Sequence, residues 1–262
     1  MKSKEQVKYF EKEWDDMKSY LKSFLKNSDQ EDLHRFRVQV KKIRSFITLA
    51  DSDEHVNLAK HFKPVKSIFK QAGVIRDAYN NLELAKKYNM QQDEFILAQQ
   101  KLMADAANDF KFAGDKQLKK IRSAHSGILE KIDPISNLHI TLFYENQLNL
   151  IANKLADIKF NDSLHESRAL VKILIYNYAL VRPVLETGFN EDYLQDVQTA
   201  IGDWHDNEVA IKLFLGHEAH DKDAVNRLKK KQTKLKNNIV SLVTNFYEQA
   251  TTVTELPVEQ VS

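Results

Sequence analysis

The sequence predicts an all-α fold of two pseudo-symmetric helical bundles, and three observations support this prediction. Apolar residues recur at helical spacing along nearly the whole chain of 262 residues. Only six glycines and four prolines interrupt that spacing, fewer than a turn-rich β architecture requires. A pattern of histidine, arginine and lysine also occurs twice, about 130 residues apart, which indicates an internal repeat.

The helical spacing predicts two series of helices. The first series covers residues 4–26, 29–50, 53–72, 76–88, 91–112 and 115–132, and the second covers 138–158, 163–187, 190–201, 205–216 and 219–250. The stretch 133–137 contains a proline between polar residues and predicts a hinge. We therefore expect residues 1–133 to form the first repeat and 138–250 the second, with a loose C-terminal tail at 251–262.

Two serine–glutamate pairs predict where two of these helices begin. Ser28 with Glu31, and Ser163 with Glu166, have the spacing of a capping box. Each pair would satisfy free backbone N–H groups at the start of its helix, at 29 and at 163.

Two glycines predict helix ends within the repeats. Gly73 and Gly202 stand where left-handed C-caps would stop a helix. Asp77 and Asp206 follow four residues later and would then suit the N-cap of the next helix. Two further glycines, Gly114 and Gly188, predict less pronounced turns between helices.

Composition excludes several classes of protein. Hydrophobic residues make up 42% and charged residues 29%, which is typical of a folded domain. The absence of cysteine excludes disulfides and thiolate metal sites and favours the cytoplasm. No apolar run approaches the ~20 residues of a membrane span, and the charged start at 1–5 lacks the apolar stretch of a signal peptide. The net charge of +2 predicts no general attraction for polyanions, so any such affinity depends on where the cations lie.

Helical geometry places the repeated cations beside the core. At 100° per residue, the first helix gathers its apolar side chains on one face: Leu33, Phe36, Val40, Ile43 and Ile47. Its basic side chains lie about a quarter turn away: His34, Arg37, Lys41 and Arg44. The second copy repeats this with core residues Leu164, Val171, Leu174 and Tyr178 beside His165, Arg168 and Lys172, although Ser167 replaces the aromatic residue.

These basic rows allow two interpretations. Long cationic side chains can extend along the edge of a bundle with their charges in water. Alternatively, pseudo-symmetry brings both rows toward one axis, where converging cations are costly unless an anion neutralises them. Because a solvated face usually mixes both signs and these rows carry no acid, we favour a site for a multivalent anion.

The duplicated pattern resembles the CHAD domain, the conserved histidine α-helical domain. The first copy matches at Leu33–Arg37, at Lys41–Arg44 and at Gly73–Asp77, and the second at Leu164–Arg168, at Lys172 and at Gly202–Asp206. The resemblance spans about residues 5–250. It implies two pseudo-symmetric bundles around a basic central channel or cleft, which binds inorganic polyphosphate without catalysis. The resemblance also implies that the protein, like some relatives, can be located on polyphosphate or storage granules.

The resemblance also implies the residues that bind polyphosphate. They are His34, Arg37, Lys41, Lys42, Arg44, His165, Arg168 and Lys172. Secondary anion contacts would come from further basic residues: Arg76, Lys119, Arg122, Arg227, Lys231 and Lys234. For most of these a solvated helix face is the competing interpretation. The chain departs from the family at Ile175, where relatives often carry another basic residue, and lysine at 41 and 42 lacks the bidentate grip of arginine.

Other functions stay open at this point. His217 and His220 have the spacing of a metal-ligand pair, but flanking turn residues disfavour it, so we expect no metal and no cofactor. Asp77 or Asp206 could serve a phosphatase, but capping explains them better, so we expect no enzyme. Nucleic acid is the nearest rival ligand, although the rows lack the interleaved aromatic residues that stack on bases. A protein-interaction scaffold is a further alternative, and His34 and His165 can instead be neutral, structural histidines.

Overall fold

The structure, a computed structural model, describes residues 3–53, 56–88, 93–216 and 222–252. In this part of the chain the regular structure is helical, which confirms the predicted all-α fold. The helices are α1 (Ser3–Asn27), α2 (Gln30–Ala50), the short 3-10 helix η1 (Asp51–Asp53), α3 (Leu58–Lys87), α4 (Asp93–Phe112), α5 (Gly114–Leu129), α6 (Asn137–Ala156), α7 (Asp162–Val181), α8 (Glu191–Leu215), α9 (Lys222–Leu242) and α10 (Phe246–Thr251). No helix among these is long and apolar enough to cross a membrane.

The predicted breaks at Gly73 and Gly202 are wrong. Helix α3 joins the predicted helices 53–72 and 76–88, and α8 joins 190–201 and 205–216. Neither glycine has a positive φ, so neither makes a left-handed cap. The two aspartates that were expected to start new helices, Asp77 and Asp206, therefore lie inside α3 and α8. Both glycines instead accommodate an arginine of the neighbouring helix, as described below.

The predicted capping boxes are also wrong, because better caps lie close by. Asp29 caps α2, where its Oδ1 accepts hydrogen bonds from the N–H groups of Glu31 at 2.7 Å and Asp32 at 3.1 Å. Ser28 takes a left-handed conformation with φ of 60° instead. Asn161 caps α7 and accepts from the N–H of Ser163 at 3.0 Å, so that serine lies within the helix. Asp and Asn are N-caps at least as good as Ser, so Asp29 and Asn161 cap these helices in place of the two serines.

The end of the described chain holds two helices where one was predicted. Asn245 has a φ of 55°, a left-handed conformation that separates α9 from α10. The predicted helix 219–250 therefore divides after Leu242. Most of the predicted tail, residues 253–262, lies outside the described residues, as does the histidine pair at 217–220.

The chain divides into two compact units. Unit 1 comprises Met1–Ile135 with Ala210–Asn226, and unit 2 comprises Ser136–Val209 with Arg227–Ser262. The division falls within the predicted hinge 133–137, although the segment Ala210–Asn226 groups with the N-terminal unit. Compactness does not demonstrate duplication, so the repeat boundaries at 133 and 138 stay a prediction.

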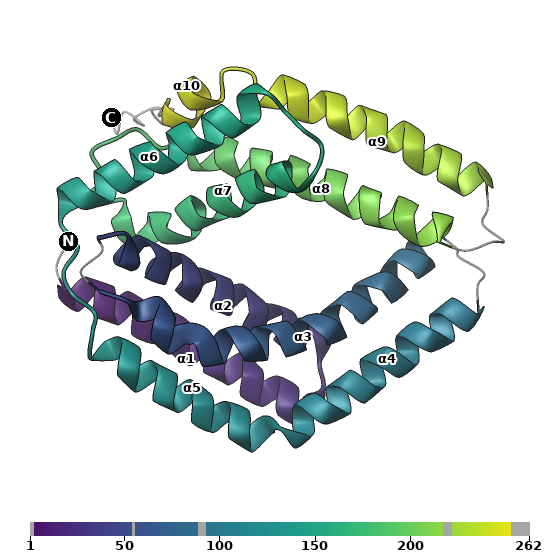
Figure 1. Cartoon of the computed structure of the whole chain (residues 1–262), viewed down its shortest axis with the longest axis horizontal. Helices are drawn as coiled ribbons and strands as arrows, with labels where there is room; N and C mark the ends of the chain where they lie inside the picture. Colours follow the sequence, from purple (N-terminus) through teal and green to yellow (C-terminus); the bar gives the residue numbers. More distant parts are fainter. Residues whose placement is uncertain (1–2, 54–55, 89–92, 217–221, 253–262) are drawn as a thin grey trace, which may run out of the picture. The chain divides into compact units, whose positions relative to one another are not determined.

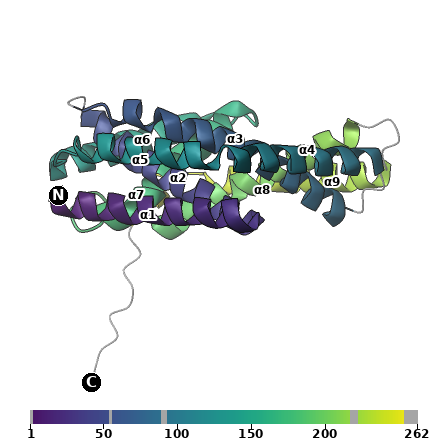
Figure 2. The same ribbon diagram turned by 90° about the horizontal axis from the view of Figure 1, so that it is seen from below.

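Helix α3 organises unit 1. Along its first half it packs against α2 and α5, and a hydrogen bond from Gln117 to Gln71 at 3.2 Å links it to α5. Farther along, Asn81 bonds to Gln99 on α4 at 3.0 Å. In both views α4 extends away from the group formed by α1, α2 and α5 (Figures 1 and 2). The core between α1, α2, α3 and α5 is aromatic, with Phe10, Trp14, Phe36, Phe46 and Phe62 almost fully buried.

Unit 2 is held by packing and by side-chain bonds to backbone carbonyls. The buried Tyr144 of α6 donates to the carbonyl of Leu174 on α7 at 2.8 Å. Helices α8 and α9 run antiparallel, since Tyr193 donates to Leu242 at 3.0 Å and Asn207 donates to Leu228 at 3.0 Å (Figure 1). Trp204 is buried, so α8 presents its neighbour His205 beside a rigid ring of the core.

Candidate anion-binding sites

Arg37 of α2 is held against α3 in a fixed position. Its Nη1 donates to the carbonyl of Phe69 at 3.1 Å, and its guanidinium lies 4.3 Å from the centre of the Phe69 ring. A Cβ atom on Gly73 would stand only 2.6 Å from Nη1, so a larger residue there would displace the arginine. Gly73 is therefore required for the close approach of Arg37.

Arg168 of α7 repeats this arrangement against α8. Its Nε donates to the carbonyl of Gln198 at 2.9 Å, and a Cβ atom on Gly202 would stand 2.7 Å from its Nη2. In both units the accepting carbonyl belongs to the residue four positions before the glycine. The arginine and the glycine of the sequence pattern are thus two parts of one contact, which we call the arginine–glycine seat.

Cations surround His34 in unit 1. Burial lowers the pKa of the His34 imidazole, and the charges of Arg76, Lys41 and Arg37 lower it further, while Glu31 opposes them. Arg76 donates to the carbonyl of Gln30 at 3.0 Å, which brings this predicted secondary contact close to the row on α2. Burial and then the positive charges around it therefore both disfavour the protonated form of His34.

The cations themselves are partly desolvated. Burial lowers the pKa of Arg37 and of Arg76, and the nearby carboxylate of Asp77 only partly opposes this effect. In unit 2, burial lowers the pKa of Lys172, and the charge of Arg168 lowers it further. Each lowered pKa indicates that the charged form of the side chain is disfavoured, because loss of water and nearby like charge both act against it.

These cations lack carboxylate partners. Within the described residues, Arg37, Arg76, Arg168 and Lys172 make no ion pair with Asp or Glu within 4.0 Å. The three arginines donate to neutral oxygen atoms, and the Lys172 Nζ lies 5.3 Å from the centre of the Tyr176 ring. Half-buried positive charge without a counter-charge is costly, and a bound anion would offset that cost.

The other predicted residues differ in their surroundings. Lys42 lies on the α1 side of α2, where its Nζ is 3.3 Å from Oε2 of the buried Glu13. Lys41 is half-buried and Arg44 is exposed. The remaining secondary candidates are exposed on α5 and α9: Lys119, Arg122, Arg227, Lys231 and Lys234. Arg122 also lines a hollow of about 90 Å³ beside α1. Anion binding by any of these residues stays a prediction, as does the basic channel between the repeats.

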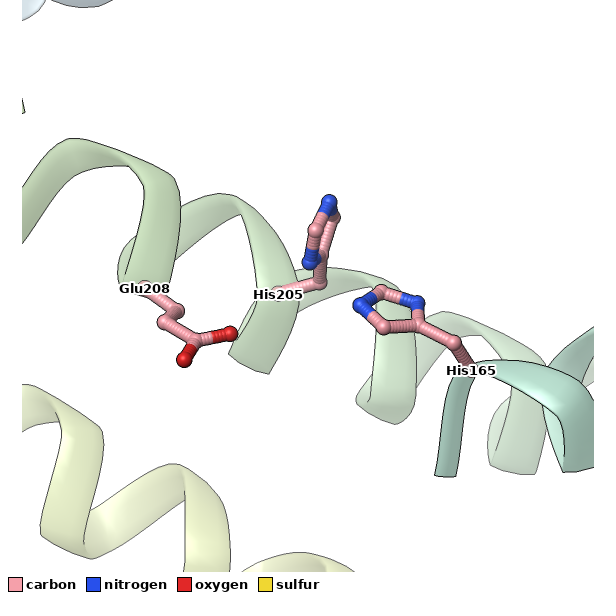
Figure 3. A group of neighbouring side chains, drawn as sticks. All are labelled: His165, His205 and Glu208. Atoms are coloured by element: carbon pink, nitrogen blue, oxygen red, sulfur yellow. The ribbon is translucent and has the colours of Figure 1, made fainter. Parts of the chain in front are cut away.

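Sequence reasoning missed two residues near His165. The ring centres of His165 and His205 are 3.9 Å apart, and Glu208 completes a group whose ligand atoms lie within 4.8 Å of one another. Figure 3 shows the two imidazoles side by side, with the Glu208 carboxylate turned toward His205. The spacing of His205 and Glu208, three residues apart on one helix, is the signal in the sequence that indicates this pair.

Comparisons with known proteins bear on the family. The model of the CHAD domain family matches residues 8–215. No curated protein matches the chain. The crystal structure of the CHAD domain from the plant Ricinus communis is similar in fold, with a TM-score of 0.63 at 16% sequence identity over 90% of this chain and 86% of that one. The family match extends over most of the sequence and includes both arginine–glycine seats, so the chain belongs to the CHAD domain family.

Proposed function

We propose that this CHAD-domain protein binds inorganic polyphosphate without catalysing a reaction on it. The observation that carries the proposal is the set of half-buried cations without carboxylate partners, Arg37 and Arg76 in unit 1 and Arg168 and Lys172 in unit 2. Polyphosphate is a thin, flexible chain with about one negative charge per phosphate. Such a chain can follow a row of cations on a helix surface, and family membership supports this choice of ligand.

The arginine–glycine seats support tight binding of phosphate. Arg37 uses Nη1 on the Phe69 carbonyl, and its guanidinium carries further N–H donors. Those donors can grip two phosphate oxygens in parallel. Because α3 already fixes the guanidinium, less side-chain entropy is lost on binding than for a freely moving arginine. The same reasoning applies to Arg168 on α8.

The two aspartates once considered for catalysis fit an electrostatic role. Asp77 and Asp206 are exposed in the middle of helices. Asp77 favours the charged form of Arg37, and Asp206 favours that of His205. We therefore propose that both aspartates adjust the charge of the neighbouring basic side chains, and that neither acts as a nucleophile.

Nucleic acid is the second candidate ligand, and a direct competition separates the two. Long-chain polyphosphate, a single-stranded oligonucleotide and triphosphate would each be titrated into the protein at about 50 mM and about 200 mM salt. We expect the tightest binding for long-chain polyphosphate, with a steep loss of affinity at the higher salt because bound counterions are released.

Three other results would change the assignment. Equal or stronger binding of the oligonucleotide would point to nucleic acid. Release of orthophosphate from polyphosphate would point to an enzyme. Failure to bind any of the three polyanions would leave a protein-interaction scaffold. We also propose a cytoplasmic location, on polyphosphate or storage granules where these occur, which a fluorescent fusion would test by co-localisation with stained polyphosphate.

A further inference from the structure

We propose that His165, His205 and Glu208 bind one divalent transition-metal ion of the zinc class. This inference goes beyond anion binding, because it assigns a different ligand to His165 and adds His205 and Glu208, which the polyphosphate proposal does not use. The three residues come from two helices of unit 2: α7 supplies His165, and α8 supplies the other two. Their candidate ligand atoms all lie within 4.8 Å of one another (Figure 3).

The distances suit a metal centre after small side-chain movements. A zinc ion binds imidazole nitrogen and carboxylate oxygen at about 2.0–2.2 Å, which places its ligand atoms about 3–4 Å apart. His205 and Glu208 are three residues apart on α8, so both side chains project from the same face of the helix. Rotation of the long Glu208 side chain can bring its carboxylate closer to the two imidazoles.

A second observation concerns the imidazole of His205. Its Nδ1 is buried and has no hydrogen-bond partner among the described residues. A buried polar atom without a partner is costly, and such atoms in native structures call for an explanation. A bond from a histidine nitrogen to a metal, or reorientation of the ring on binding one, would satisfy that atom. His205 also meets His165 edge to face, an arrangement in which two protonated rings would repel.

Carboxylates stand beside the two imidazoles. Glu208 is one of the three grouped ligands, and Asp206 neighbours His205 on α8. Arg168 also lies near the group, so the negative charge of Glu208 is needed to offset it when a cation binds.

The ligand set selects the class of metal. Two imidazoles and one carboxylate form a typical three-residue zinc site, which leaves a further position for water or another ligand. Magnesium prefers oxygen ligands in an octahedron and would gain little from the two imidazoles. His165 and Glu208 are half-exposed, so an ion can reach the group from solvent.

The test is a titration of the full chain with zinc alone, in the absence of polyphosphate. We expect the parent protein to bind one equivalent of zinc, and its melting temperature to rise when zinc is bound. The double variant His165→Gln with His205→Gln should no longer bind zinc. The variant Glu208→Gln should bind zinc at least about tenfold more weakly than the parent. Magnesium should cause no comparable shift.

A matched histidine variant serves as the control. His34→Gln removes the corresponding histidine of unit 1 and should leave zinc binding unchanged. Because the double histidine variant can lose stability, far-UV circular dichroism would verify its helicity, and the single change at the half-exposed Glu208 provides an independent test. Unchanged zinc affinity in Glu208→Gln and in the double variant would overturn the proposal, and so would a parent protein that binds no zinc. None of these outcomes depends on polyphosphate, so the metal and polyphosphate proposals can fail separately.

Discussion

Helices α2 and α3 of unit 1 and helices α7 and α8 of unit 2 share one contact and differ beside it. In both pairs an arginine donates to a carbonyl and lies against a glycine. Three and six residues beyond that glycine, α3 carries Arg76 and Tyr79, whereas α8 carries His205 and Glu208. The first pair thus surrounds its histidine with cations, while the second places a histidine and a carboxylate there. We propose on this basis that one scaffold contact supports two different ligand chemistries, and that the residues at these two positions decide between them.

The largest expected difference between the two pairs concerns their cores. Phe36 of α2 and Ser167 of α7 occupy matching positions, and both are fully buried. We expect Phe36→Ala to lower the free energy of unfolding by about 3–5 kcal/mol, because it leaves a cavity. Ser167 bonds only to the carbonyl of Ser163 in its own helix, so Ser167→Ala should cost about 1 kcal/mol or less. Urea denaturation of both variants measures the two losses, and equal losses would contradict the expected difference between the two cores.

The arginine–glycine seat predicts a smaller but more specific effect. Alanine at Gly73 would gain about 1 kcal/mol from helix propensity. Its Cβ atom would nevertheless displace Arg37, so we expect a net loss of about 1–2 kcal/mol in the free energy of unfolding. The same change at Gly202 should displace Arg168 with a similar loss.

A double-mutant cycle isolates the cause of this loss. In a protein that already carries Arg37→Ala, the change Gly73→Ala should be neutral or stabilising, since no guanidinium remains to be displaced. Destabilisation of the same size in both backgrounds would show that the glycine serves another purpose.

Exchange of the two distinguishing positions tests the division of ligands. In a protein that already carries His165→Gln and His205→Gln, we expect Arg76→His with Tyr79→Glu to raise zinc affinity about tenfold, which corresponds to ~1.4 kcal/mol. The new ligands would lie beside His34, as His205 and Glu208 lie beside His165. Zinc titration by calorimetry measures the gain. An unchanged affinity would mean that these two positions do not decide the ligand.

The smallest predicted effect is a pH dependence in unit 1. The pKa of His34 is lowered from 6.5 by burial and by neighbouring cations. A bound polyanion favours the protonated imidazole, so polyphosphate binding should take up a proton and strengthen as the pH falls below about 6.5. We expect the parent to bind about threefold tighter than His34→Gln at about pH 5.5 and equally at about pH 8. A parent and variant that differ equally at both pH values would exclude this role for His34.

The sequence predicted the helices of this fold better than their ends. Regular apolar spacing identified α2 and α7 to within a few residues, apart from the C-terminal end of α7, and the repeated cations led to Arg37 and Arg168. Gly73 was misread as a helix end, because a glycine that seats a neighbouring side chain has the same local appearance as a C-cap. Only the packing of α2 on α3 distinguishes these cases, and no local pattern encodes that packing.

The candidate sites show the same limit. Lys42 belongs to the predicted row, yet its charge faces Glu13 of α1, a partner that lies far away in the sequence. His205 and Glu208 were overlooked because their third ligand, His165, comes from another helix. Residue type and helical spacing therefore indicated which side chains could carry function, while contacts between helices decided their partners.

The central claim is that half-buried cations without carboxylate partners bind inorganic polyphosphate. The most direct test replaces four of them together, Arg37, Arg76, Arg168 and Lys172, each with glutamine. Its control replaces four exposed lysines with glutamine, Lys63 and Lys66 in unit 1 and Lys229 and Lys230 in unit 2, which removes the same net charge. We expect the first variant to lose about 100-fold or more in affinity for long-chain polyphosphate, and the control about tenfold or less. Equal losses in the two variants, at unchanged helicity, would contradict the account.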